Sequence, residues 1–448
     1  MSKTQISAVS ANQQGSLAGH QANPLAKLGG FSFVESVVDG IANMNGDRKA
    51  RKQIFLTDAN KAIERKDLLK KLNLWIELLE SNDSTEKILD SCKTKSLAAA
   101  DTLKKGLKNA LVQTRELETS YRTVAQFYKN TELDKVDNVH IVNASLEQVK
   151  DLDNPLFIDH IEAEFKQYYD RLDLRDNYSI LAVPGYLGSN KVVEKWAKVC
   201  SENKVMLVTD FADLDKADDV VDLFHSANLT GGEIHRSNVI MTCNWIVGRG
   251  RAKEVGEEDS VFLPPSTSLA GKIHKTLMSQ VAAGKKHGSI SEVDAVKFDL
   301  KKSEISQLEK MGLVPMVNEY GKIMAFSAKT LFTGDNIGLQ TYSVVRVFDY
   351  VTKVLLDFLN RRAFENWTAK NEDDLRKQIV RFLDGIKGAD KLIEKFKIVR
   401  FEQDKLQKDR VWLDIRLTPY FPAKSFVIKL DGHKGDDGNE WDAEYVQE

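Results

Sequence analysis

The chain has 448 residues, 42% of them hydrophobic and 29% charged, a composition typical of a globular protein of two or three domains rather than a disordered one. Its 64 Lys and Arg residues are balanced by 66 Asp and Glu residues, so the overall charge gives no indication of nucleic-acid binding. The odd number of widely spaced cysteines (Cys92, Cys200, Cys243) and the lack of any apolar run near the roughly 18 residues of a membrane span predict a cytoplasmic protein without a transmembrane helix.

Residues 1–46 predict an N-terminal arm that ends in a short helix. The first 30 residues are too poor in apolar side chains to order themselves, and they lack the apolar middle of a secretory signal. Ser32 and Glu35 then match a capping box, and five apolar residues follow at helical spacing: Phe33, Val34, Val37, Val38 and Ile41. A helix this short is marginal alone, so it needs a groove, either in its own domain or in a partner.

Residues 47–135 predict a helical region. Residues 47–71 contain nine basic and four acidic residues. This excess of positive charge favours a solvent-exposed side of a helix, with contact to an acidic partner as the alternative. Leu68, Leu72, either Trp75 or Ile76, and Leu79 then indicate a second helix with a face to bury. One or two further helices should fill residues 84–129, with Gly106 as the candidate break.

Residues 136–335 predict a wound α/β domain, because short apolar strands alternate with helical patterns. The expected strands are residues 139–142, 178–183, 205–209 and 238–246, and the expected helices between them are residues 191–200 and 220–227. Residues 247–261 are charged and glycine-containing, which is typical of a surface loop.

Residues 336–430 predict a C-terminal domain that opens with a long helix near Thr341. Apolar residues recur there at spacings of three and four: Val344, Phe348, Val351, Leu355 and Phe358. Two more helices are expected at residues 373–383 and 390–397. Residues 431–448 carry seven acidic residues and predict a solvent-exposed tail.

Two strands are expected after these helices. Val411, Leu413, Ile415 and Leu417 alternate with other residues and should form one strand face, and Phe426 and Ile428 should belong to a second strand. Pro419 and Pro422 cannot donate hydrogen bonds to a strand ladder, so they should belong to the connection between the strands or to a sheet edge. Two strands are too small a sheet to be stable alone, so they should dock on their own domain as a peripheral hairpin or take a strand from another chain.

The strongest enzyme signal is the Gly185–Gly188 loop, which follows a predicted strand and precedes a helix, with Asp210 beyond it. A dinucleotide site would use these elements, but the motif reads Gly-Tyr-Leu-Gly, and Tyr186 occupies the space of the pyrophosphate. The chain has no P-loop, no G-x-S-x-G, no H-x-x-x-H and no C-x-x-C motif. We therefore expect no catalytic residue, metal or cofactor, with a nucleotide-binding α/β enzyme using this loop as the alternative.

Four stretches resemble the large subunit of the type VI secretion contractile sheath, a relative of phage tail sheath proteins. Residues 263–271 are similar to the sheath segment in which two prolines and a serine precede Ala-Gly, and residues 321–331 resemble the stretch that ends in Ala-Arg-Thr-Leu. Residues 342–367 resemble a long sheath helix, and residues 414–428 the closing strands, although Lys424 replaces the usual acid. The departures resemble a divergent, Bacteroidetes-like branch.

The resemblance implies a non-enzymatic protein that pairs with a small sheath subunit and with other copies of itself. Together they would form a helical tubule around an inner tube protein, attached through a baseplate to the inner membrane complex from the bacterial cytoplasm and recycled by an AAA+ ATPase. With this in view we expect a mixed α/β fold whose C-terminal strands form an intersubunit sheet through the strand residues given above. An arm from a neighbour would supply the missing strand. The helix from Phe33 to Ile41 would bind the small subunit or the ATPase.

Overall fold

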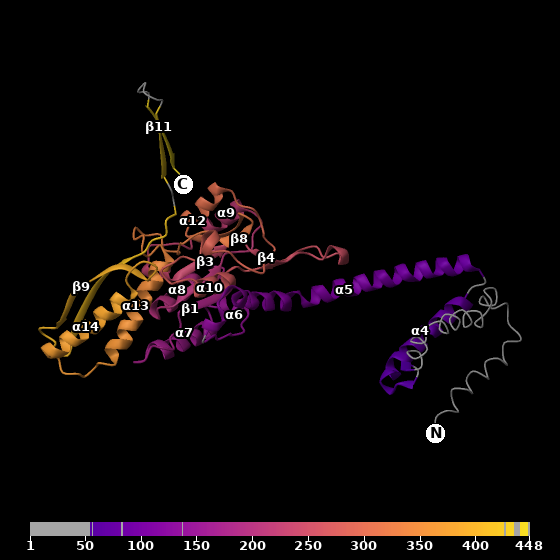
Figure 1. Ribbon diagram of the computed structural model, residues 1–448, viewed down its shortest axis with the longest axis horizontal. Helices are drawn as coiled ribbons and strands as arrows, with labels where there is room; N and C mark the ends of the chain where they lie inside the picture. Colours follow the sequence, from indigo (N-terminus) through magenta and orange to yellow (C-terminus); the bar gives the residue numbers. More distant parts are fainter. Residues whose placement is uncertain are drawn as a thin grey trace. The chain divides into compact units, whose positions relative to one another are not determined.

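The computed structural model describes residues 54–55, 57–81, 84–136, 138–424, 427–433 and 440–446 (Figure 1). The chain divides into two compact units, Met1–Ala110 and Leu111–Glu448, which we call unit 1 and unit 2. The short helix predicted around residues 33–41 lies outside the described residues.

The described part of unit 1 is mainly helical, as predicted. A turn of 3-10 helix, η2 (Ala59–Lys61), leads into α4 (Ala62–Glu80), and α5 (Thr85–Asn130) begins in unit 1 and ends in unit 2. The expected break at Gly106 is wrong, because α5 passes through this residue. A single glycine costs a helix only about 1 kcal/mol, and the Leu, Lys and Ala residues around it favour helix.

The centre of unit 2 is a five-stranded sheet in the order β1-β2-β3-β7-β8. Its strands are β1 (Ile180–Tyr186), β2 (Met206–Asp210), β3 (Val239–Cys243), β7 (Leu313–Glu319) and β8 (Lys322–Ala325). The first four are parallel, and β8 returns antiparallel to β7 through Tyr320 and Gly321, both at positive φ. This arrangement confirms the predicted wound α/β fold.

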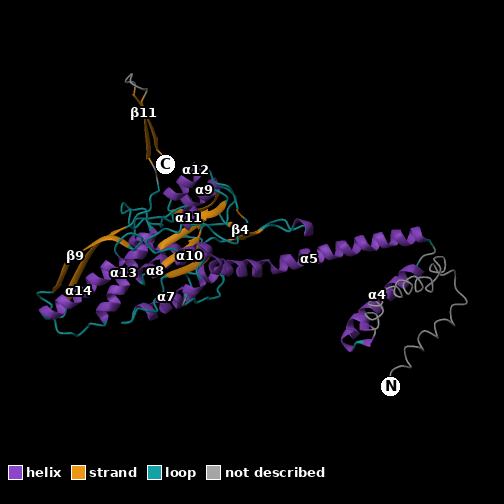
Figure 2. Cartoon of the chain, in the orientation of Figure 1, coloured by secondary structure: helices purple, strands orange, loops and turns teal. Residues whose placement is uncertain are grey.

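Helices cover both faces of this sheet (Figure 2). Side chains alternate along β2, so that Leu207 joins the core beneath one set of helices while Met206 and Val208 join the core on the other side. The first face is covered by α7 (Leu156–Tyr169), α8 (Asn190–Glu202), α9 (Ala217–Ala227) and α12 (Lys302–Lys310). The second face is covered by α10 (Ser266–Lys275) and by the start of α13 (Tyr342–Asn360).

Smaller elements complete the α/β domain. The short helices are η3 (Leu133–Lys135), α6 (Leu146–Lys150), η4 (Ile234–Asn238), η5 (Lys253–Val255) and α11 (Gly284–His287). A second sheet, in the order β5-β4-β6, is formed by β4 (Ile246–Arg249), β5 (Val261–Leu263) and β6 (Ala295–Val296).

Three expectations for this domain need correction. The single strand predicted at residues 238–246 is two strands, because Asn244 turns the chain at φ +65 and binds the carbonyls of Phe298 and Met316 through its side chain. The expected surface loop at 247–261 begins and ends in strand. Residues 139–142 form no strand, because no neighbouring strand is present to pair with their backbone groups. Their apolar side chains, those of Val139, Ile141 and Val142, are exposed.

The C-terminal part of unit 2 has its own core, in which the second half of α13 and α14 (Ala369–Ile386) pack on a two-stranded sheet. That sheet consists of β9 (Ile393–Gln403) and β10 (Val411–Pro419), which are antiparallel. The prediction of a helix at 390–397 is wrong. Phe396 and Ile398 pack inward between outward lysines at the period of a strand, and pairing with β10 supplies the backbone partners.

Two further strands, β11 (Val427–His433) and β12 (Glu440–Val446), form a separate antiparallel hairpin. The sequence predicted that the strand at 411–417 and the strand at 426–430 make one pair, but each has a different partner, β9 and β12 respectively. The expected acidic tail therefore contains a strand. Acidic composition argues against burial, but it does not prevent backbone pairing.

Candidate functional site

Asp210, the acid considered for a ribose site, is fully buried at the end of β2. Its carboxylate oxygens accept hydrogen bonds from the backbone N–H of Gly185 (2.8 Å) and Ser266 (2.7 Å) and from the hydroxyls of Thr242 (2.5 Å) and Ser266 (2.6 Å). Burial raises the pKa of Asp210 to about 6, against the opposing effect of these donors. Because both oxygens are used within the chain, Asp210 joins β1, β3 and α10 and is not free to hold a ribose.

The segment at 263–271, noted for its two prolines and serine, gives α10 its start and its close packing. Ser266 is the first residue of α10 and donates to Asp210. At Gly271 an added Cβ would lie 2.6 Å from the carbonyl oxygen of Phe127, so only glycine lets α10 approach the end of α5 this closely. The segment stands out in the sequence, but the groups it contacts come from distant parts of the chain.

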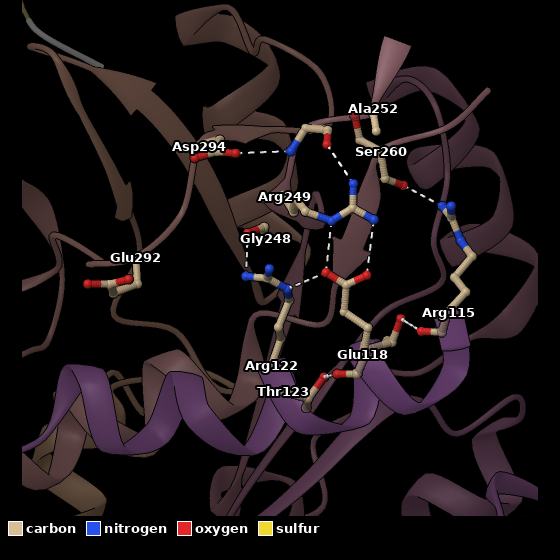
Figure 3. Close-up of polar contacts among 12 residues, drawn as sticks. Arg115, Glu118, Arg122, Thr123, Gly248, Arg249, Ala252, Ser260, Glu292 and Asp294 are labelled. Carbon is tan, nitrogen blue, oxygen red and sulfur yellow. Dashed lines mark hydrogen bonds and ion pairs between the residues drawn. The ribbon is translucent and has the colours of Figure 1, made fainter. Parts of the chain in front are cut away.

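A network of ion pairs attaches α5 to the loop between β4 and β5 (Figure 3). Arg249 binds both oxygens of Glu118, at 2.8 and 3.0 Å, and both oxygens of Glu257, at 2.8 and 3.0 Å. Arg122 also donates to Glu118 (2.8 Å) and to the carbonyl of Gly248 (3.2 Å). Bidentate pairs of this kind fix orientation as well as adding energy, so the network holds the part of α5 in unit 2 against β4 and the loop after it.

Glu257 is the most buried acid of this network, with only 8% of its side chain exposed. Hydrogen bonding to Arg249 lowers the pKa of Glu257 to about 2. The stabilisation that this pair contributes is therefore present above the ordinary pKa of a glutamate and is lost as the pH falls toward 2.

Replacing Arg249 by methionine is expected to destabilise unit 2 by about 2–3 kcal/mol at pH 7, because Glu118 and Glu257 keep their charge without their main partner. Urea unfolding measures the loss, and hydrogen exchange should rise along the part of α5 beyond Ala110. Arg251→Met is the matched control, since Arg251 is exposed and its side chain bonds, among the described residues, only to the carbonyl of Glu258. Equal stability of the two variants would contradict the assigned role.

The predicted strand residues of β10 lie on two different kinds of surface. Leu413, Ile415 and Leu417 face inward and pack on the C-terminal core, as their alternation predicted. Val411, expected on the same face, is 40% exposed, because it lies at the strand end, beyond that core. On the described residues β10 pairs only with β9, so its other edge presents unpaired backbone groups.

The β11–β12 hairpin carries the remaining predicted residue, Ile428, whose side chain is 53% exposed; Phe426 lies outside the described residues. Within the described residues each of the two strands has only the other as its partner. A two-stranded hairpin is marginal in water, and both outer edges of this one can accept another strand. Of the five described residues of the predicted intersubunit sheet, the structure thus places four in β10 and Ile428 in β11.

The segment that leads from β10 to β11 is tied to the α/β domain by Lys424. Its ammonium lies 2.6 Å from Oε2 of Glu309 on α12, and Glu309 is only 5% exposed. An acid at position 424 would meet this buried carboxylate with like charge. The lysine that departs from the expected pattern therefore suits its surroundings in this chain.

Unit 1 presents apolar side chains that its described part does not cover. The large exposed apolar residues of its two helices are Ile63, Leu68, Leu69, Leu72, Leu74, Trp75, Leu89, Leu97, Leu103 and Leu107. No residue of α4 is buried, although the sequence pattern predicted a burying face. Patches of this kind are typical of protein–protein contact, and we call this set the unit 1 apolar surface.

Within the described residues no group of three or more His, Cys, Asp or Glu side chains is placed to hold a metal ion. Among the same residues, no helix combines the length and the apolarity that crossing a membrane requires.

Three models of one protein family match consecutive parts of the chain. Residues 18–107 match the TssC/VipB-like N-terminal region, residues 109–333 the type VI secretion system TssC/VipB central domain, and residues 341–447 the TssC/VipB-like C-terminal domain. A comparison with curated protein sequences found no match.

Solved structures show similarity at the level of the fold. A chain of the anti-feeding prophage baseplate superposes with a TM-score of 0.50 at 14% identity, over 70% of this chain and 80% of that one. A chain of the contracted helical sheath of the same prophage gives a TM-score of 0.49 at 15% identity, over 71% and 82% of the two chains.

Proposed function

The chain belongs to the TssC/VipB family and is a subunit of a type VI secretion contractile sheath, and from this premise we propose how it joins its neighbours. The joint is strand addition at the β11–β12 hairpin and at the open edge of β10. The observation that carries this proposal is the pairing of the C-terminal strands, which leaves two separate two-stranded sheets with open edges in the described residues.

The hairpin is the more favourable of the two acceptors. Among the described residues β11 and β12 pair only with each other, and a two-stranded hairpin is marginal in water, so it gains most from a third strand. An added strand supplies backbone hydrogen bonds worth about 0.5–1.5 kcal/mol each. Five such bonds hold two subunits together with a few kcal/mol, before any side chain is buried.

The strand donor in this proposal is the N-terminal arm of another copy, residues 1–30. Its composition cannot support a domain of its own, and chains that order only on binding can join subunits while leaving their domains free to repack. A head-to-tail joint of this kind does not close on itself and makes a filament.

The direct test is co-expression of the chain with the small sheath subunit, followed by negative-stain electron microscopy. Helical tubules are expected from the full chain. A variant without residues 1–30 is expected to remain soluble and to form none. Normal tubules from that variant would show that the donor strand lies elsewhere.

We further propose that the unit 1 apolar surface binds the small sheath subunit. Its residues lie along α4 and the part of α5 in unit 1, and exposed apolar side chains on helices suit packing against helices of a partner.

Replacing Leu69 and Trp75 by glutamate is expected to reduce co-purification of the small subunit by about 30-fold or more, the effect of losing apolar contacts worth at least about 2 kcal/mol at an interface centre. Quantified pull-down of the tagged chain measures it. The control is Leu133→Glu in unit 2, where a residue of similar exposure is changed in the same way. Undiminished co-purification would place the small subunit on another surface.

Other features of the assembly follow from the family and are part of the same proposal. The tubule surrounds an inner tube, is attached to a baseplate, works in the bacterial cytoplasm and is recycled by an AAA+ ATPase. The protein acts without catalysis, which is supported by the structural use of Asp210, the acid of the one nucleotide-like loop in the sequence.

A further inference from the structure

A cavity of about 320 Å³ lies beside α13 in unit 2, outside the surfaces described above. One side of α13 contributes residues at helical spacing, including Arg346, Asp349 and Lys353. The facing wall comes from residues 174–179 before β1 and from the start of β2, with Lys204 between α8 and β2. We call it the Arg346 cavity.

Arg346 has no partner for its charge within the described residues. Its side chain makes neither a hydrogen bond nor an ion pair there, and its Nη1 atom is buried without a hydrogen-bond acceptor. Burial lowers the pKa of Arg346 to about 10, so the guanidinium remains charged at neutral pH. A buried cation without a counter-ion is strongly unfavourable, whereas buried polar groups in folded proteins are nearly always satisfied.

The two carboxylates that line the cavity are engaged with other groups. Asp349 accepts a hydrogen bond from the side chain of Asn238 (2.8 Å) and lies 3.8 Å from the ammonium of Lys204. Asp357 accepts from the backbone N–H of Leu174 and pairs with Arg361 at 2.5 Å. Neither therefore serves Arg346 as a counter-ion.

A second cation adds to this local excess of positive charge. The ammonium of Lys353 donates to the side-chain oxygen of Asn177 (2.7 Å) and to the carbonyl of Tyr178 (2.8 Å), both neutral acceptors. Burial lowers the pKa of Lys353 to about 8. The charge of the cavity favours an anion, and the apolar walls, with Met206 and Met278 among them, favour one that carries a carbon group.

We propose that the Arg346 cavity binds a carboxylate, either as a small free acid or as an acidic side chain of a neighbouring subunit in the sheath. A carboxylate suits the planar guanidinium through two parallel hydrogen bonds. A doubly charged phosphate is disfavoured, because Asp349 and Asp357 line the same cavity. The second source rests on the proposed assembly of the chain, whereas the first does not.

The first experiment uses the full chain alone and measures Tm in sodium acetate, sodium chloride and sodium phosphate at equal ionic strength. Acetate is expected to raise Tm by about 1–2 °C more than chloride or phosphate at saturation, since a ligand that binds only the folded state stabilises it. The specific rise is expected to disappear in Arg346→Met and to persist in the exposed control Arg381→Met. An equal rise with all three salts, or an acetate response that persists in Arg346→Met, would overturn the proposal.

Two further measurements complete the test. If Arg346→Met fails to fold, Arg346→Lys is measured instead, because it keeps the charge but loses the planar guanidinium. In Arg346→Lys, acetate should still raise Tm more than chloride does, but by less than in the wild type. An acetate response equal to that of the wild type refutes the assignment to Arg346. Tubules made with the small subunit then identify the source. If Arg346→Met tubules dissociate at a lower sodium chloride concentration than wild-type tubules, the carboxylate belongs to a neighbouring subunit. If both kinds of tubule dissociate at the same concentration, the carboxylate is a free acid. If wild-type chain forms no tubules, assembly fails, but the Tm comparison still decides whether the cavity binds a carboxylate.

Discussion

A chain truncated after Lys424 is expected to fold and remain soluble but to form no tubules with the small sheath subunit. The truncation removes β11 and β12, which pair only with each other among the described residues. It leaves the Lys424–Glu309 ion pair in place. Tm and circular dichroism should therefore change little, while negative-stain electron microscopy should change from filaments to free particles.

A single substitution separates strand pairing from the loss of a whole segment. Ile428 is paired with Tyr445 in the hairpin register, and proline at 428 removes a backbone N–H and prevents regular pairing at that point. Ile428→Pro is expected to abolish tubules as the truncation does. Ile428→Val, which retains a strand-favouring branched side chain, is the matched control and should assemble normally. If the truncated chain and Ile428→Pro both form tubules like those of the wild type, the joint between subunits does not lie at the hairpin.

Asp210→Asn is expected to cost about 2–4 kcal/mol of folding free energy at pH 7. The substitution replaces one accepting carboxylate oxygen by an amide N–H₂ group, which is itself a donor and cannot accept the hydrogen bonds that this oxygen accepted. The lost acceptor affects Gly185, Thr242 and Ser266 at once, so β1, β3 and α10 are all loosened. Urea unfolding measures the loss. Asp215→Asn in the loop after β2 is the control, since the Asp215 side chain is 80% exposed, and it should cost less than about 1 kcal/mol.

The pH dependence of stability gives an independent check on Asp210. Its pKa in the folded protein, about 6, is above the ordinary value of 3.8. The folded state therefore holds a proton that the unfolded state has released between these values, and the stability of the wild type falls by about 3 kcal/mol as the pH rises from about 4 to about 6. Asp210→Asn should lack this part of the decline. An identical pH profile in both proteins would show that Asp210 titrates normally.

The effect of Asp210→Asn on assembly should be indirect. The residue lies inside unit 2 with no exposed surface, so variants that retain their fold are expected to retain tubule formation. If a folded variant forms no tubules, the cause should be a change in how α10 packs against the end of α5 at Gly271. This outcome separates a defect of the core from a defect of the C-terminal joint.

The sequence by itself determined the wound α/β domain and its main helices. Strands such as residues 178–183 and 205–209 are recognisable because a strand covered on both faces is apolar throughout. The helix from Tyr342 is recognisable because its apolar residues return every three or four positions. The alternation of Leu413, Ile415 and Leu417 likewise predicted their inward face. These patterns are local, and they survive folding because burial requires them.

What only the tertiary structure decided is which distant groups meet. Residues 393–397 form a strand because β10 lies beside them, and no local pattern contains that partner. Asp210 stands out in the sequence as a possible ribose ligand, whereas in the structure it binds donors on β1, β3 and α10. The spacing of residues cannot place these donors beside it. Arg346 reads in the sequence as one cation on an apolar helix, and only the folding of residues 174–179 over α13 leaves it buried without a counter-ion. Periodicity reports which face of an element is buried, whereas strand partners, ion pairs and cavities depend on contacts between residues far apart in the chain, which a one-dimensional pattern does not encode.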